Sequence, residues 1–390
     1  MVRSRRSRHR RGRERVQRAQ EAMARSGFDA LFLATGTNLC FLSGYPTIEL
    51  TLARPFYLIL PTRGEPTLLV HTGREAEARR YAWVDDVRTY QRLSVAPIEE
   101  LATAFHDRGL RGQRVGAELG REQRLGMPVA EFERVRQELA PTRFEDAADL
   151  LWDLRMIKTE DDIAAIRRAC LITARAYDDT FRGAHAGDLD RVVAAHLAAA
   201  MTDRDGRDPW VLVASGSGNY ALATGAPHDR KLEPGDMLWF DAGCAVEGFW
   251  SDFSRAGVVG RPSADQREAQ RRIVKLTARA LAMVQPGVAV AEIAALVNTG
   301  VRDIGLAVEV ATSDQAGRVG HGIGYDVTEP PHVSIEDSTI LKPGMVITIE
   351  PGVATSDGLF HAEEVVLVTT DGHEVLSRSR RSLRSIALAR

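Results

Sequence analysis

Short apolar runs in the second half of this chain begin or end at acidic residues, and this pattern constrains the fold more than any other. Residues 237–240 (Met-Leu-Trp-Phe) lead directly into Asp241, and residues 345–349 (Met-Val-Ile-Thr-Ile) lead directly into Glu350. Glu363 opens a third apolar segment. A carboxylate at the end of a buried strand loses its hydration, so it must be paired or bound to a metal ion. The pattern therefore predicts strands that carry an acidic site at their ends.

Two further residues complete a possible set of metal ligands. Asp252 follows Asp241 by 11 residues, a spacing that suits a hairpin of two adjacent strands. His321 lies in residues 320–324 (Gly-His-Gly-Ile-Gly), where glycines allow the backbone to approach other groups closely. Taken singly, an acid at the end of a strand is more often a turn residue, and a histidine in a glycine-rich loop is more often a surface residue. The prediction therefore depends on the five residues together.

Four carboxylates and one imidazole can hold two divalent cations, with carboxylates that bridge the pair. Oxygen-rich ligation without thiolates suits manganese, cobalt, zinc or iron. A metal pair of this kind would bind a bridging hydroxide, which is the nucleophile in metal-assisted hydrolysis. The predicted cofactors are therefore two divalent metal ions.

The first third of the chain alternates between helical and strand-like patterns. Residues 15–26 have a helical pattern that ends at Gly27. Short apolar strands are expected at residues 30–34, 56–60 and 67–70. The pattern predicts a small N-terminal α/β domain at residues 1–150 and a second, metal-binding domain at residues 151–390. The fold class is therefore α/β (α+β) with two domains.

The N-terminus is rich in arginine. Residues 3–18 contain nine arginines and one acidic residue, Glu14, and no apolar core follows them, so this is not a secretory signal. We expect residues 1–14 to form a disordered basic arm, and the alternative is a contact with nucleic acid or anionic lipid. The whole chain has 51 basic and 53 acidic residues, so no nucleic-acid partner is expected.

The composition excludes two other classes of protein. No stretch reaches the roughly 18 apolar residues that a membrane helix needs, so no membrane partner is expected. The three cysteines, Cys40, Cys170 and Cys244, are far apart and form no C-x-x-C pair. This usage excludes a disulfide scaffold or a cysteine zinc site and favours a reducing compartment, here the cytoplasm.

The acidic motifs resemble those of the creatinase, prolidase and aminopeptidase P superfamily in order and spacing. The matching segments are residues 240–243 (FDAG), 251–255 (SDFSR), 320–324 (GHGIG), 348–352 (TIEPG) and 363–369 (EEVVLVT). Residues 38–45 (NLCFLSGY) resemble the family's N-terminal domain, and residues 154–160 (LRMIKTE) resemble its domain junction. The resemblance covers the chain after the arginine-rich arm, and it implies a creatinase-like N-terminal domain and a pita-bread catalytic domain.

The resemblance also implies roles for individual residues. The implied metal ligands are Asp241, Asp252, His321, Glu350 and Glu363. Of these, Asp252 and Glu363 would bridge the two ions, and Glu350 would also take part in catalysis. Glu364 is the alternative to Glu363 if the preceding loop shifts the register by one residue. The family further implies a homodimer, in which the small domain of one subunit often covers the site of the other.

At two positions the residue differs from the one that the family's peptidases carry. These enzymes carry a histidine 17 residues before the first metal aspartate and another seven residues after the metal histidine, and both handle substrate and protons. Here the two positions are Thr224 and Thr328. Threonine is a poor general acid. Either another histidine takes over, with His228, His332 and His361 as candidates, or the substrate has changed.

The predicted function is that of a metal-dependent hydrolase that resembles Xaa-Pro dipeptidases and aminopeptidases. It would cleave a C–N bond in an Xaa-Pro peptide or a small amino-acid derivative. The first alternative is a lyase or hydrolase of a small zwitterion, similar to dimethylsulfoniopropionate lyase or ectoine hydrolase, because residues 328–330 (Thr-Glu-Pro) resemble that lyase more than prolidase. The second alternative is a non-catalytic binding protein, although such family members typically lack the metal ligands.

Overall fold

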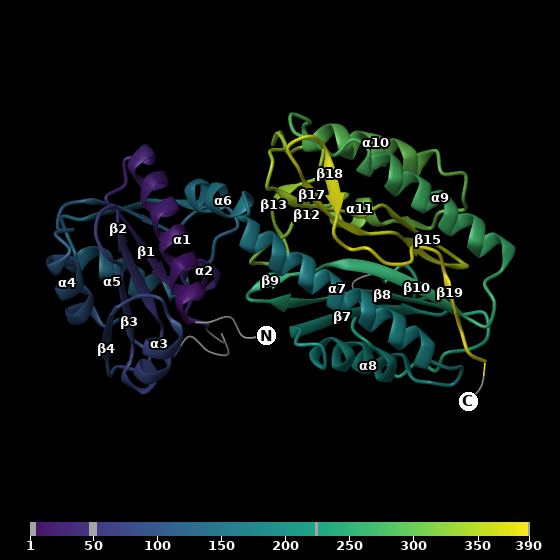
Figure 1. Ribbon diagram of the computed structural model, residues 1–390, viewed down its shortest axis with the longest axis horizontal. Helices are drawn as coiled ribbons and strands as arrows, with labels where there is room; N and C mark the ends of the chain where they lie inside the picture. Colours follow the sequence, from purple (N-terminus) through teal and green to yellow (C-terminus); the bar gives the residue numbers. More distant parts are fainter. Residues whose placement is uncertain (1–4, 47–52, 223–224, 389–390) are drawn as a thin grey trace. The chain divides into compact units, whose positions relative to one another are not determined.

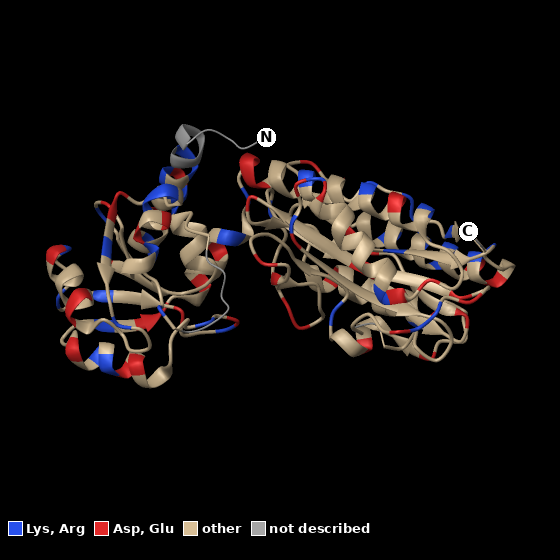
Figure 2. Ribbon diagram, turned by 90° about the horizontal axis from the view of Figure 1, so that it is seen from below, with Lys and Arg blue, Asp and Glu red and all other residues tan. Residues whose placement is uncertain are grey.

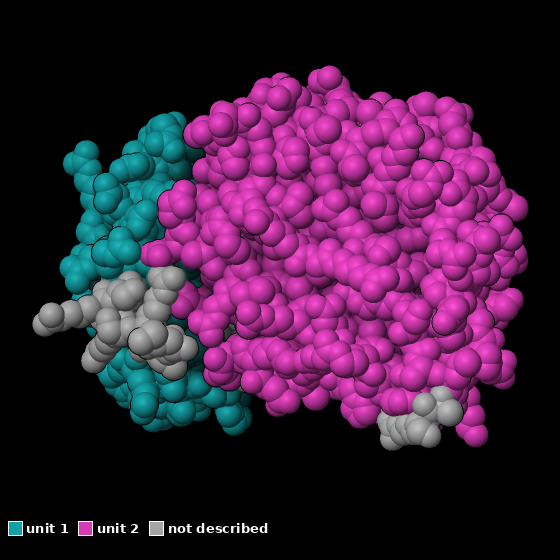
Figure 3. All heavy atoms as spheres, turned by 45° about the vertical axis from the view of Figure 1, so that its right-hand side comes forward, with its two compact units in different colours: residues 1–154 teal, residues 155–390 magenta. Residues whose placement is uncertain are grey.

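The chain forms two compact units, Met1–Leu154 and Arg155–Arg390 (Figure 3). The computed structural model describes residues 5–46, 53–222 and 225–388. Both units combine helices with sheets, which confirms the predicted α/β class. Within the described ranges, no helix has the length and apolar character needed to cross a bilayer. The sequence placed the domain boundary between residues 150 and 151, close to the division between the two units.

Unit 1 contains a mixed six-stranded sheet in the order β4-β3-β2-β1-β5-β6. Its strands are β1 (Ala30–Ala34), β2 (Tyr57–Pro61), β3 (Thr67–His71), β4 (Asp86–Tyr90), β5 (Arg114–Ala117) and β6 (Arg143–Asp146). The central strand β1 is buried along its whole length. Its Phe32 ring packs against Tyr57, Phe105 and Phe144, at centroid distances of 5.8, 6.0 and 5.7 Å. These aromatic contacts form part of the core of this unit.

The first helix of unit 1 begins earlier than the sequence suggested. The helices of this unit are α1 (Arg5–Ser26), α2 (Thr37–Ser43), α3 (Glu75–Tyr81), α4 (Ile98–Asp107), α5 (Val129–Glu138) and α6 (Ala148–Met156), with a 3₁₀ turn at Thr72–Arg74. Figure 2 shows basic residues along α1. Residues 5–14 are therefore helical where we expected a disordered arm; residues 1–4 lie outside the described part.

Arginine favours this helix, and Arg15 anchors it within unit 1. Arginine has a high helix propensity. In addition, the Arg15 guanidinium is buried, donates to the Phe41 carbonyl at 3.2 Å and lies 4.4 Å from the centre of the Phe41 ring.

The described part of unit 2 contains three sheets. The first has the order β19-β10-β8-β7 with β9 beside β8, the second β11-β15-β16, and the third β13-β12-β14-β17-β18. The strands are β7 (Arg207–Ser215), β8 (Met237–Val246), β9 (Phe249–Trp250), β10 (Phe253–Val259), β11 (Val310–Ala311), β12 (His321–Gly322), β13 (Glu329–His332), β14 (Val346–Ile349), β15 (Gly352–Thr355), β16 (Gly358–His361), β17 (Glu364–Val368), β18 (His373–Val375) and β19 (Arg384–Ile386).

Helices cover these strands on both sides. They are α7 (Glu160–Gly183), α8 (Asp190–Thr202), α9 (Ala264–Leu281), α10 (Val290–Arg302) and the short α11 (Thr312–Ala316). In Figure 1, α7 and α8 lie on one side of the strands of unit 2, and α9 and α10 lie on the other. The capping box predicted at Thr159 and Asp162 is present at the start of α7. The helices therefore bury the strands of unit 2 between them.

Candidate metal centre

One antiparallel hairpin carries Asp241 and Asp252. Asp241 lies in β8 opposite Ser254 of β10, and Asp252 directly precedes β10. The 11-residue spacing thus corresponds to a hairpin, as the sequence predicted. The Oδ1 atoms of both aspartates are buried and have no hydrogen-bond partner. Each carboxylate therefore has acceptor capacity that the protein leaves unused.

The third sheet of unit 2 carries the other candidate ligands. Gly322 in β12 pairs with Ile347 of β14, and Ile349 of β14 pairs with Glu364 of β17. Continuing the β14–β17 register by one step sets Glu350 opposite Glu363. Gly322 is required here, because a Cβ at this position would lie 2.2 Å from the Pro330 carbonyl oxygen. The bulge between His321 and Gly322 also shifts the register at this point.

The His321 ring is oriented as in many metal sites. Its Nε2 lies 3.3 Å from Asp252 Oδ2 and 3.9 Å from Glu350 Oε2. Its Nδ1 lies 3.0 Å from the Gly322 carbonyl oxygen, which can only accept a hydrogen bond. Nδ1 therefore carries a proton, and Nε2 is the ring nitrogen that faces the carboxylates. Metal-binding histidines typically donate their second ring N–H in this way.

Glu363 and Glu364 have different surroundings although they are neighbours. Both carboxylate oxygens of Glu363 are buried and have no hydrogen-bond partner. Glu364 accepts from Arg255 at 3.0 Å and from Arg381 at 2.7 Å, and it also accepts from the Ser377 hydroxyl. Its charge is thus balanced by protein groups. The geometry favours Glu363 over Glu364 as the ligand at this position.

Burial and neighbouring carboxylates raise the pKa of Asp241 and of Glu363. Burial and then the Asp252 charge raise the pKa of Asp241 well above its ordinary value. Burial and then the Asp241 charge do the same to the pKa of Glu363. Burial opposes the charged form of His321, but the Glu350 and Asp252 carboxylates outweigh it and raise its pKa. Such a crowded set of carboxylates favours the binding of cations.

The donor set fits a pair of divalent cations. Ligand atoms of Asp252, His321 and Glu363 lie within 4.8 Å of one another, and so do those of Glu350, His361 and Glu363. Glu363 belongs to both groups, which fits a bridging carboxylate. Asp241 belongs to neither group; it lies opposite Ser254 in the β8–β10 ladder, and the Ser254 hydroxyl accepts from the Glu363 backbone N–H at 3.3 Å. Hard oxygen donors with one or two imidazoles suit first-row divalent ions.

The candidate proton shuttles lie in different places. Thr224 lies outside the described residues, and Thr328 is exposed directly before β13. His332 in β13 pairs with His321 across the β12–β13 ladder, so its side chain lies at the edge of the centre. His361 is buried at the end of β16, where its Nε2 lies 3.0 Å from the Glu350 carbonyl oxygen.

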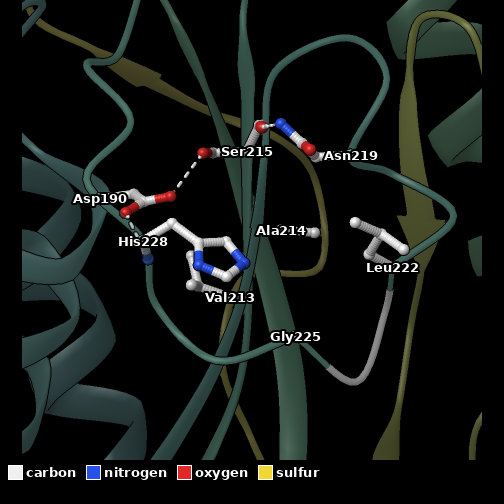
Figure 4. A pocket seen from close by; sticks show the side chains of 8 residues that line it. All are labelled: Asp190, Val213, Ala214, Ser215, Asn219, Leu222, Gly225 and His228. Atoms are coloured by element: carbon white, nitrogen blue, oxygen red, sulfur yellow. Dashed lines mark hydrogen bonds between the residues drawn. The ribbon is translucent and has the colours of Figure 1, made fainter.

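His228 lines a different hollow, shown in Figure 4. The residues that line this hollow include none of the five candidate ligands. Asp190 Oδ1 accepts from the His228 backbone N–H at 2.9 Å, and Asp190 Oδ2 accepts from the Ser215 hydroxyl at 2.9 Å. Asp190 thus orders the loop that carries His228.

Sequence reasoning missed Arg318. Its Nε lies 3.7 Å from Glu350 Oε1, and its NH1 donates to His332 Nδ1 at 3.3 Å. Arg318 therefore brings a positive charge to the partly open side of the cluster. Its position three residues before His321, in the same glycine-rich loop, was the available signal.

A second group that the sequence did not assign is a buried ion network around Glu329. Glu329 accepts from Lys158 at 2.6 Å and from Arg155 at 2.7 Å, and these three side chains are 1–2% exposed. Arg155 also pairs with Asp326 at 2.7 Å. The network fixes the segment that leads from His321 through Thr328 into β13. Arg155 and Lys158 lie in the segment 154–160, which the sequence linked to the family without giving it a role.

Two family models match the chain. Residues 164–370 match metallopeptidase family M24, and residues 15–157 match the creatinase/prolidase N-terminal domain. Together they span most of both units.

Individual relatives agree with these models. The Xaa-Pro dipeptidase of Pyrococcus horikoshii is 28% identical over 373 residues, which cover 95% of this chain and 98% of that protein. The Xaa-Pro dipeptidase of Pyrococcus furiosus is 32% identical over 243 residues, which cover 62% of this chain and 68% of that protein. The crystal structure of the prolidase from Pyrococcus horikoshii OT3 superposes with a TM-score of 0.80 at 26% identity, over 95% of this chain and 99% of that one.

Proposed function

Because this chain belongs to metallopeptidase family M24, we propose that it hydrolyses the peptide bond before proline in Xaa-Pro dipeptides. The observation that carries this proposal is the buried cluster of Asp241, Asp252, His321, Glu350 and Glu363, whose aspartate Oδ1 atoms and Glu363 oxygens have no protein partner. The names of the two Pyrococcus relatives support the substrate class.

We propose that the same five residues hold two divalent cations. Asp252 and Glu363 would bridge them, with Asp241 on one side and His321 and Glu350 on the other. When bound, two such cations supply a nucleophilic water at neutral pH and polarise the scissile carbonyl group. Reconstitution with manganese, cobalt, zinc and iron in turn would show which ion supports the highest activity.

The chain's own residues then orient the substrate and move protons. Glu350, with 15% of its side chain exposed, is the carboxylate we assign to accept the proton of the attacking water. Arg318 beside it can stabilise negative charge that develops on the substrate. His332 replaces the missing family histidines in this proposal and donates a proton to the leaving proline nitrogen. Thr328 would contribute at most a hydrogen bond.

Steady-state kinetics on paired dipeptides test the proposal. The metal-reconstituted protein should cleave Xaa-Pro dipeptides with a kcat/KM of about 10⁴ M⁻¹s⁻¹ or more, and should cleave matched Xaa-Ala dipeptides far less. Asp252→Ala should lose activity and retain its circular dichroism spectrum. A folded protein with two bound ions and no turnover of any Xaa-Pro dipeptide would overturn the proposal.

Two further expectations are also proposals. The family resemblance supports a homodimer, and light scattering should then give twice the chain mass of 42.8 kDa; a value of one chain mass at micromolar concentration would contradict it. The three cysteines are all buried and are too few for a disulfide scaffold, which fits the cytoplasmic location expected from their number. Fractionation of the source cells would test the location.

A further inference from the structure

The His361 ring fits at its position only because the residue paired with it is glycine. It ends β16 and pairs with Gly352 of β15, and its side chain is buried. A Cβ at residue 352 would lie 2.5 Å from the His361 Cδ2 atom, so glycine at this position leaves room for the ring. The ring also lies 5.6 Å from the Trp239 ring, centroid to centroid. Its orientation is therefore set by packing on more than one side.

The hydrogen bonds of His361 leave one ring nitrogen available. Nε2 lies 3.0 Å from the Glu350 carbonyl oxygen, which only accepts, so Nε2 carries the proton. Nδ1 then has a lone pair, is buried and has no hydrogen-bond partner. A buried acceptor of this kind needs an explanation.

His321 shows the same arrangement with the nitrogens exchanged. Its Nδ1 donates to the Gly322 carbonyl, and its Nε2 faces Asp252 and Glu350. In both rings a backbone carbonyl fixes the tautomer and leaves the other nitrogen as a donor atom for a metal. Both rings lie beside the same acidic cluster.

A ring nitrogen of His361 lies within 4.8 Å of carboxylate oxygens of both Glu350 and Glu363, which also lie within that distance of each other. We propose that His361 binds, through Nδ1, the cation that Glu350 and Glu363 hold. The inference rests on the proposed metal centre, and it adds a sixth ligand that the family resemblance does not assign. It also removes His361 from the candidate proton shuttles.

The proposal has a consequence for metal preference. With His321 and His361 both bound, this cation would have two imidazole ligands beside its carboxylates. Imidazole favours zinc, cobalt and iron, whereas carboxylate and water ligands suit manganese. Replacement of His361 should therefore weaken cobalt binding more than manganese binding.

The test separates ligation from packing with two variants at residue 361. His361→Gln retains an amide N–H that can donate to the Glu350 carbonyl but lacks the imidazole lone pair, and His361→Ala removes both. Cobalt titrations by calorimetry should give two sites in the unaltered protein. In His361→Gln the affinity of one site should fall by about 10-fold or more, with a smaller change for manganese. His332→Ala is the matched control and should retain both cobalt affinities.

Proton magnetic resonance of the cobalt-loaded protein gives a second measurement that does not depend on activity. Exchangeable ring N–H signals shifted by cobalt should come from two histidines in the unaltered protein and in His332→Ala, and from one in His361→Gln. Circular dichroism and urea unfolding of each metal-free variant show whether the chain still folds. If His361→Ala fails to fold, His361→Gln still decides the question.

Each outcome bears on the inference. If His361→Gln retains both cobalt affinities and both shifted signals, His361 only packs against Glu350 and the inference is overturned. If the unaltered protein binds two cobalt ions with two shifted ring signals but cleaves no Xaa-Pro dipeptide, the inference stands and the proposed function falls. An unaltered protein that binds none of manganese, cobalt, zinc and iron overturns both.

Discussion

Glu364 forms a buried ion pair with Arg255, at 3.0 Å between Oε1 and NH2, while the adjacent Glu363 has no partner for either carboxylate oxygen. The Arg255 and Glu364 side chains are 2% and 1% exposed. Arg255 also donates to the Glu363 carbonyl oxygen at 2.9 Å and to the Ser377 carbonyl oxygen at 2.9 Å. The same arginine thus neutralises one glutamate and holds the backbone of the other, which leaves the Glu363 side chain to a cation.

Substitution by glutamine should have opposite effects on metal binding and stability at the two neighbouring glutamates. Glu363→Gln should abolish binding of both metal ions and leave the metal-free protein at least as stable, because it removes an unpaired buried charge. Glu364→Gln should lower the free energy of unfolding by about 3–5 kcal/mol, because Arg255 is then left buried without its main partner. Elemental analysis after reconstitution and urea unfolding measure the two effects. Metal loss in Glu364→Gln with stability unchanged would show that Glu364 is the ligand.

The stability of the metal-free protein should fall as the pH rises. The pKa values of Asp241 and Glu363 are raised above their ordinary values of 3.8 and 4.5, so the folded chain binds more protons than the unfolded chain above that range. Their contribution to stability is complete below those values and is lost as the pH rises through the raised pKa values. His321, whose pKa is also raised, acts in the same direction.

Urea unfolding of chelator-treated protein at about pH 5 and about pH 8 measures this slope. We expect a loss of at least about 1.4 kcal/mol, the equivalent of one pKa unit, and a smaller loss in Asp241→Asn. Added manganese or cobalt should restore stability at the higher pH, because the cations replace the protons. Equal stability of the metal-free protein at both pH values would contradict the prediction.

The ion network around Glu329 should contribute strongly to stability. Glu329→Gln leaves Lys158 and Arg155 without their shared carboxylate in a buried site, and should cost about 3–5 kcal/mol of unfolding free energy. The matched control is Asp326→Asn, since Asp326 pairs with the same Arg155 but is 37% exposed, and should cost about 0–1 kcal/mol. Similar losses in the two variants would show that burial does not decide the effect.

Replacement of histidines should identify the group that protonates the leaving nitrogen. His332→Ala should lower kcat on Xaa-Pro dipeptides by about 10²-fold or more, as expected for loss of a general acid, and should flatten the pH dependence of kcat. His228→Ala should have activity close to that of the unaltered protein, because His228 lines the hollow around Asp190. A larger loss in His228→Ala than in His332→Ala would reverse the assignment.

The sequence by itself determined the fold class and which segments carry the acidic residues. Strand-like apolar runs that meet Asp241, Glu350 and Glu363 are local patterns, because side-chain alternation and the cost of burying a carboxylate act within a few residues. The Thr159 capping box is also local, and the structure confirms it. Five such motifs in order were sufficient to indicate the family that the comparisons show.

Tertiary structure decided which neighbouring or distant side chains share an environment. Glu363 and Glu364 lie in the same local sequence, and they differ because Arg255, 109 residues from Glu364, pairs with Glu364. His332 approaches the centre through the β12–β13 register, and His361 approaches it through a hydrogen bond to the backbone of Glu350. His228 joins a different loop through Asp190. These outcomes depend on pairing between strands and side chains far apart in the sequence, and no local pattern encodes that pairing.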